Sequence, residues 1–265
     1  MTADLDAATT FVHTNARVLE RHRLALLRGE AGGEPVVRAL LAYRNEDGGF
    51  GHGLEPDLRA PESQPAAAWH AFEVFADVAP VTAPEAVELC DYLDAVALPD
   101  GGLPFGLPIE DPRGTAPFWA EADPQAFSLQ ITAIVAAHAN RVAAHDPAVA
   151  GHPWLARATS CCLAAIAALE GAPEAYVLAF ALQLLDAVHD REAMALWQRA
   201  FHSPTAPGST GDRLVFHRLP GHDLDTEAHS TLFSGEQSNS TVMFGERVFA
   251  ELRRIARKSR RCGSR

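Results

Sequence analysis

Residues 43–51 have the sequence YRNEDGGFG, in which an acidic residue, two glycines and a large apolar residue follow one another. Two consecutive glycines supply the positive φ angles that reverse a chain after a helix. The carboxylate of Asp47 can accept hydrogen bonds from backbone N–H groups of such a turn, and Phe50 can pack between helices. The stretch therefore predicts a tight connection between two helices, with a structural role.

A second copy of this pattern, DGGLPF at residues 100–105, begins 53 residues after the first. The loop of the first copy contains Glu55-Pro56-Asp57, and we expect its following helix to open at Glu62. The loop of the second copy contains Glu121-Ala122-Asp123, with a helix opening near Pro124. A third hairpin, without the glycine pair, joins about 153–169 to 174–189. The sequence therefore predicts a repeat of helical hairpins.

Apolar residues recur at helical spacing along most of the chain, and glycine and proline clusters separate the periodic segments. Only 214–219 alternates in a way that favours a strand. The sequence thus predicts an all-α fold. The expected helices lie at about 8–28, 35–44, 69–75, 86–96, 127–138, 155–169, 177–188 and 240–258.

The run from Tyr43 to Gly51 resembles the Q-x-x-D-G-G-F/W signature of the terpenoid cyclase and protein prenyltransferase repeat, with Arg44 in place of the usual Gln. The continuation from His52 to Pro65 is similar to small actinobacterial proteins that carry this repeat. The resemblance covers about residues 10–200. It implies an α/α toroid, in which outer and inner helices surround a central hollow.

We expect a single α/α toroid domain over residues 1–265, with the clearest repeats at about 35–190. No further DGGW-like copy follows residue 203, so a complete ring of six hairpins is not predicted. We expect 203–239 to be irregular and 240–265 to form a C-terminal helix with a basic tail.

Charge excludes one class of partner. The chain has 34 acidic and 22 basic residues, and 7 of the basic residues lie in 253–265, so residues 1–252 hold 15 basic against 34 acidic residues, a net charge of −19. Such a body repels phosphate backbones and argues against nucleic acid as a partner. No apolar stretch reaches the ~20 residues of a membrane span, and the polar N-terminus is unlike a secretory signal. We therefore expect a soluble, cytoplasmic protein, with four cysteines that form no disulfide framework.

The loops after the two DGG turns carry the candidate site, because each runs toward the expected mouth of the hollow. Two carboxylates across a partly apolar cavity can act as acid and base, since one charge raises the pKa of the other. The candidate catalytic residues are Glu55, Asp57 and Asp123. The candidate substrate-binding residues are His52, Arg59, Trp69, Trp119 and Glu121. His70 lies beside Trp69 in the same helix.

The same residues also allow a structural interpretation, in which Asp57 and Asp123 cap the inner helices and nearby arginines balance their charge. Two further motifs lie near the C-terminus. Asp223-Leu224-Asp225-Thr226 resembles the acidic motif of class II terpenoid cyclases in part, with Thr226 at the fourth position. His217, His222 and His229 form the densest group of potential metal ligands, although their spacing matches no known motif. The sequence specifies neither a metal nor a cofactor.

Three functions remain open. The resemblance favours a terpene cyclase-like or prenyltransferase-like protein that binds or transforms a small apolar molecule, such as an isoprenoid, by acid–base chemistry. The second is a non-catalytic module that binds a partner with its concave face. The third is a carbohydrate-active enzyme with paired carboxylates, since α/α toroids also host such enzymes. Fold alone does not choose among them.

Overall fold

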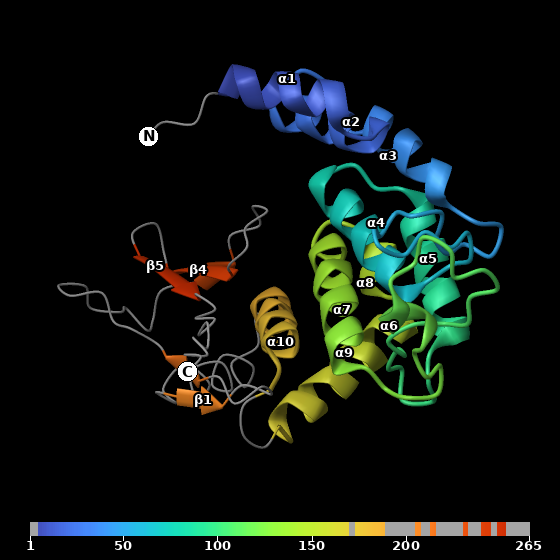
Figure 1. Ribbon diagram of the computed structural model, residues 1–265, viewed down its shortest axis with the longest axis vertical. Helices are drawn as coiled ribbons and strands as arrows, with labels where there is room; N and C mark the ends of the chain where they lie inside the picture. Colours follow the sequence, from blue (N-terminus) through green and yellow to red (C-terminus); the bar gives the residue numbers. More distant parts are fainter. Residues whose placement is uncertain are drawn as a thin grey trace, which may run out of the picture. The chain divides into compact units, whose positions relative to one another are not determined.

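The computed structural model describes residues 5–169 and 173–188, together with five short strands between 205 and 252 (Figure 1). The chain divides into two compact units, residues 1–162 and 163–265. From residue 5 to 188 the described residues form helices and loops, so this part of the chain is all-helical as expected.

The helices are α1 (Leu5–Asn15), α2 (Val18–Leu27), α3 (Glu34–Leu40), α4 (Pro65–Asp77), α5 (Pro84–Val96), α6 (Pro117–Ala120), α7 (Leu129–Ala143), α8 (Pro147–Ala150), α9 (Pro153–Ala167) and α10 (Ala175–Val188). A 3-10 turn, η1 (Leu41–Tyr43), extends α3 to the first DGG turn. Most expected helices are confirmed, with the differences given below.

The two DGG turns have the same backbone geometry. Gly48 and Gly101 both have positive φ, at +85° and +89°. Asp47 Oδ1 accepts a hydrogen bond from the N–H of Gly49 at 2.9 Å, and Asp100 Oδ1 accepts the equivalent bond from Gly102 at 3.0 Å. The structural role predicted for the DGG turns is therefore confirmed in both copies.

Each turn also fixes the start of the helix that follows its loop. The carbonyl of Phe50 accepts a hydrogen bond from the N–H of Gln64, which precedes α4, at 2.9 Å. The carbonyl of Leu103 accepts the same bond from Ser128, which precedes α7, at 2.9 Å. Leu103, fully buried like Phe50, is therefore the equivalent of Phe50 in the second copy.

Helices α4 and α7 lie side by side and form the centre of the first unit (Figure 1). Every residue from Ile131 to Ala139 of α7 is buried, and four consecutive residues, Pro65 to Ala68, are buried at the start of α4. The small alanine side chains let the two helices approach closely. The two helices that follow DGG turns are thus the most buried pair in this unit.

Three expected boundaries are wrong. The helix expected over 8–28 is two helices, because Arg17 has an extended backbone (φ −63°, ψ 162°). The helices expected to open at Glu62 and near Pro124 begin at Pro65 and Leu129. The segments before them stay as loop, and the two loops bond each other through the N–H of Ala116 to the carbonyl of Asp57 and through a bridge between Leu58 and Thr115.

The prediction of a C-terminal helix at about 240–258 is wrong for residues 240–244 and 248–252. Residues Ser240–Phe244 and Val248–Leu252 form strands β4 and β5, which pair antiparallel, and β4 also pairs with β3 (Ser230–Leu232). Valine, threonine and phenylalanine favour extended backbone, and a short apolar run with spacing of four allows either assignment. Residues 253–258 lie outside the described residues.

A second sheet pairs β1 (Thr205–Pro207) antiparallel with β2 (Arg213–Val215). The strand expected at 214–219 is therefore present at its start, and the segment 203–239, expected to be irregular, contains three short strands. Within the described residues, no helix has the length and apolar content that a membrane span requires. Three cysteines, Cys90, Cys161 and Cys162, are free thiols.

Candidate functional site

The loops after the two DGG turns contact each other. The side-chain amide of Gln64, 1% exposed, donates to the carbonyl of Leu107 at 3.1 Å and accepts from its N–H at 2.8 Å. The N–H of Ala116 donates to the carbonyl of Asp57 at 2.8 Å. The two loops therefore lie against each other.

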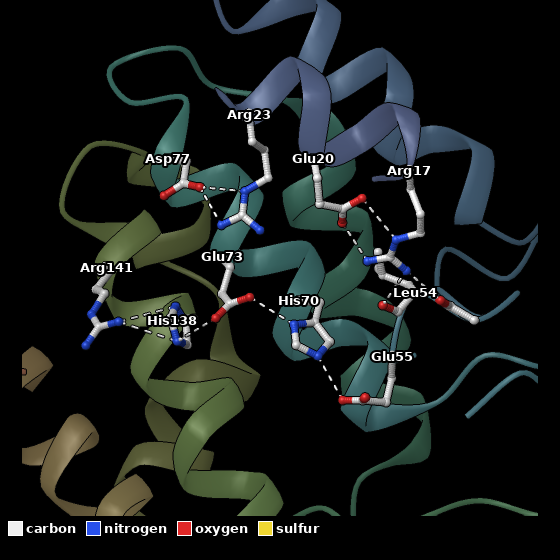
Figure 2. Close-up of polar contacts among 11 residues, drawn as sticks. Arg17, Glu20, Arg23, Leu54, Glu55, His70, Glu73, Asp77, His138 and Arg141 are labelled. Atoms are coloured by element: carbon white, nitrogen blue, oxygen red, sulfur yellow. Dashed lines mark hydrogen bonds and ion pairs between the residues drawn. The ribbon is translucent and has the colours of Figure 1, made fainter. Parts of the chain in front are cut away.

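The first loop and helix α4 form a charged chain around His70 (Figure 2). His70 Nε2 lies 2.8 Å from Glu55 Oε2, and His70 Nδ1 lies 2.9 Å from Glu73 Oε2. Helix α7 adds His138, whose Nε2 lies 3.8 Å from Glu73 Oε1. Three segments of chain therefore bring two carboxylates and two imidazoles into one group, which we call the His70 cluster (Glu55, His70, Glu73 and His138).

The His70 cluster is shielded from water but not sealed off. The exposed fractions of its side chains are 14% for Glu55, 22% for His70, 24% for Glu73 and 9% for His138. Interactions between charges are stronger here than in bulk water, because water screens them less.

The two histidines have opposite protonation states. Burial alone would lower the pKa of His70, but its hydrogen bonds with Glu55 and Glu73 outweigh burial and raise this pKa to about 9. Burial, together with the nearby charge of Arg141, lowers the pKa of His138 to about 3. At neutral pH His70 is therefore an imidazolium and His138 is a neutral imidazole.

Glu73 is fixed as a carboxylate. Burial would raise its pKa, but the hydrogen bond and positive charge of His70 outweigh this and lower the pKa to about 2. Two acidic side chains, Glu55 and Glu73, flank the one imidazolium of His70. The chain Glu55–His70–Glu73 thus carries a net charge of −1 and attracts positive charge on a bound molecule.

An indole ring covers one side of this chain. The rings of Trp69 and His70 are stacked, with centroids 4.4 Å apart and planes at 22°. The Trp69 ring also lies 6.5 Å from the ring of His138. An imidazolium against an indole face is a favourable cation–π arrangement, so Trp69 helps to hold His70 in its charged form.

The other candidate carboxylates do not join this group through any contact in the described structure. Asp57 Oδ1 accepts a hydrogen bond from Trp119 Nε1 at 2.7 Å, and Trp119 stacks on Phe105 with ring centroids 4.5 Å apart. Asp123 Oδ1 accepts from the N–H of Gln125 at 2.9 Å. The residues that precede α4 and α7 are Gln64 and Ser128, so neither aspartate caps an inner helix as the structural interpretation proposed.

The remaining candidates lie around the loops. His52, with φ of +55°, has its Nε2 2.9 Å from Asn45 Oδ1. Arg59 Nε donates to the carbonyl of Pro56 at 3.4 Å, and Glu121 is an exposed residue directly after α6. The structure therefore brings Glu55 into the His70 cluster and Trp69 against it, and places the other six candidates elsewhere on the loops and short helix.

Sequence reasoning missed Glu73 and His138. Glu73 lies three residues after His70, a spacing that puts two side chains on the same face of a helix. His138 follows the apolar spacing of α7, and this position by itself indicates a core side chain. A histidine on the buried face of an otherwise apolar helix was the available signal, because buried polar groups require partners.

No group of three or more His, Cys, Asp or Glu side chains in the described structure could hold a metal ion. The histidines at 217, 222 and 229 and the acidic motif at 223–226 lie outside the described residues. No family model matches this chain, and no curated protein matches it either.

Proposed function

We propose that this chain is an α/α toroid of helical hairpins that binds a small apolar molecule of isoprenoid type beside the His70 cluster and transforms it by proton transfer. Two repeated turns and the packing of α4 against α7 support the toroid, since both helices follow the same turn and become the most buried pair. The resemblance of residues 43–51 to the terpenoid cyclase repeat supports the class of substrate.

The observation that carries the proposal is the charged chain Glu55–His70–Glu73, stacked against Trp69 on an alanine-rich helix pair. Removing three charged groups from water costs several kcal/mol per ion before their attraction offsets it. The DGG turn does not require these charges, because the second copy has Ile134 and Ala137 at the positions of His70 and Glu73. A charged group that the repeated turn does not require, and that water still reaches in part, is typical of a binding or catalytic site.

The charges suggest how such a site would act. A substrate that develops positive charge on carbon would be stabilised by the net negative chain and by the indole face of Trp69. Glu55 would accept the proton that such a substrate loses, because a carboxylate oxygen can serve as a general base. His70 would hold Glu55 in place through its Nε2.

The paired-carboxylate alternative receives less support. Glycosidases need an open gap of about 5–10 Å between two carboxylates, in which the glycosidic bond and a water lie. Between Glu55 and Glu73 the gap is filled by the ring of His70. This pair is therefore not free to flank a sugar.

The test is to offer the protein prenyl diphosphates and neutral polyprenes, following binding by tryptophan fluorescence and products by mass spectrometry. We expect binding of a member of this class, and a loss of turnover of about 10²–10⁴-fold in E55Q and H70N. The matched control is E34Q, because Glu34 forms an ion pair with Arg38 on an exposed face of α3. Absence of any binding would refute the proposal, and binding without turnover would favour a non-catalytic module.

A further inference from the structure

Arg17 lies between the two N-terminal helices and reaches the loop that carries Glu55 (Figure 2). Its Nη1 donates to the carbonyl of Gly53 at 2.7 Å and to the carbonyl of Leu54 at 3.1 Å. These contacts cross 36 and 37 residues of sequence, so they join two separate parts of the first unit.

The guanidinium of Arg17 is itself held on two further sides. Glu20 accepts hydrogen bonds from Nε at 3.0 Å and from Nη2 at 2.6 Å. The Cζ atom of Arg17 lies 5.5 Å from the centroid of the Tyr43 ring. Because the planar guanidinium of Arg17 is bonded to Glu20 on one side, its orientation is fixed, and the hydrogen bonds to the two carbonyl oxygens are fixed with it.

The carbonyl of Leu54 belongs to the peptide bond that leads into Glu55. Leu54 is 1% exposed, and the two residues before it, His52 and Gly53, both have positive φ, at 55° and 74°. A loop with a non-glycine residue in this conformation needs contacts that maintain it. Arg17 provides two of them directly before the residue that bonds His70.

Arg23 of α2 approaches the helix that carries His70. Arg23 Nη2 lies 2.6 Å from Asp77 Oδ2, at the end of α4 and one turn after Glu73. Helix α2 is thus attached to the loop before the His70 cluster and to the helix that carries the cluster.

We propose that Arg17 is a positioning residue, which holds the Leu54–Glu55 peptide so that the carboxylate of Glu55 stays on His70 Nε2. The charged and titratable groups that act on His70 are Glu55 from the loop and Glu73 from α4, while His138 of α7 lies beside Glu73 and is itself influenced by Arg141 of α7 and Arg23 of α2. The consequence of this role of Arg17 for a reaction rests on the function proposed above, whereas the effect of Arg17 on the pKa of His70 does not.

The test follows the titration of the His70 ring by NMR in the full chain, with the signal assigned by its loss in H70N. In R17Q we expect the midpoint of His70 to fall by about 1 pH unit or more, because one of two carboxylate partners is no longer held. R17K keeps the positive charge but loses the planar guanidinium. If the midpoint of His70 also falls in R17K, the effect comes from the geometry of the guanidinium contacts and not from the charge.

E20Q serves as a second route if R17Q does not fold, since it removes the charge that orients Arg17, and we expect a smaller fall. R38Q is the control, because Arg38 pairs with Glu34 with 72% of its side chain exposed, and its His70 midpoint should equal that of the wild type. An unchanged midpoint in folded R17Q and E20Q would overturn the inference. Because this titration needs no substrate, failure of the wild type to bind polyprenes would not affect it.

Discussion

The first and second helical hairpins share one turn but differ in the side chains that follow it. Both turns have a positive-φ glycine, an aspartate that accepts from the second glycine, and a carbonyl that bonds the residue before the helix. Counted from Gln64 and Ser128, the residues before α4 and α7, His70 corresponds to Ile134 and Glu73 to Ala137. The first copy carries charges where the second copy is apolar.

This difference separates what the fold needs from what it does not. The second hairpin shows that the turn and the buried helix form with apolar residues at the positions of His70 and Glu73. The repeated turn and helix therefore do not account for the charged residues at these positions of the first hairpin. Variants of the turns and of the His70 cluster can test whether this division holds.

The largest effect is expected where the turn leaves no room for a side chain. A Cβ on Gly49 would lie 2.5 Å from the Cβ of buried Ser63 and 2.9 Å from the ring of Tyr92. A Cβ on Gly102 would lie 2.5 Å from the ring of Phe127, which is 37% exposed and can move. We expect G49A to lower the free energy of unfolding by about 3 kcal/mol and G102A by about 1 kcal/mol in urea titrations.

G32A is the control for these two variants, because nothing lies within 4 Å of a Cβ at Gly32. Its free energy of unfolding should stay within about 0.5 kcal/mol of the wild type. Equal losses in G49A and G102A would mean that the two turns are packed alike, contrary to this comparison.

The next effect concerns the replacement of His70 by the isoleucine that the second copy has. H70I removes the positive charge between Glu55 and Glu73, so two partly buried carboxylates face each other without a partner. We expect a loss of about 2–3 kcal/mol at pH 7, measured by urea unfolding. The triple variant E55Q/H70I/E73A removes both carboxylates and should recover most of this loss; if it does not, the cluster is needed for folding itself.

The pH dependence of stability is the third test. His70 has its pKa raised from 6.5 to about 9, so its contribution is complete below pH 6.5 and is lost as the pH rises toward 9. His138 has its pKa lowered from 6.5 to about 3, and Glu73 from 4.5 to about 2, so their contributions are lost as the pH falls below 6.5 and 4.5. Stability should therefore be greatest near pH 6.5.

Each limb of this profile can be assigned with one variant. The alkaline limb, worth up to about 3 kcal/mol between pH 6.5 and 9, should flatten in H70I. The acid limb should begin at lower pH in H138L, because the histidine that resists protonation is absent. An alkaline limb that persists unchanged in H70I would show that His70 is not the charged group.

The turns were predictable from sequence because their chemistry is local. Gly48, Asp47 and Phe50 act within a few residues of one another, and the same pattern appears twice. The His70 cluster was predictable only in part, because its members come from a loop and two helices. Glu55 and Trp69 were named from their place near the turn, whereas Glu73 and His138 become neighbours only when α4 packs on α7.

Helix boundaries failed for a related reason. The apolar spacing of 8–28 is continuous, yet the chain bends at Arg17, where the side chain leaves the helix to bond carbonyls 36 and 37 residues away. At 240–252 the apolar spacing suits a helix as well as a strand, and pairing between segments decides it. Such contacts between distant segments leave no periodic signal in the sequence.

The smallest expected effect lies in the second loop and shows how firmly the two loops are joined. Trp119 is 7% exposed, stacks on Phe105 and donates from Nε1 to Asp57 Oδ1 at 2.7 Å. W119F keeps an aromatic ring against Phe105 but removes this donor, so we expect a loss of about 1 kcal/mol in urea unfolding. D57N, which keeps an oxygen acceptor, should lose less. If W119F lost as much free energy of unfolding as G49A, the longer loop of the second hairpin would stabilise the fold as much as the turns do. The two hairpins would then differ only in the His70 cluster.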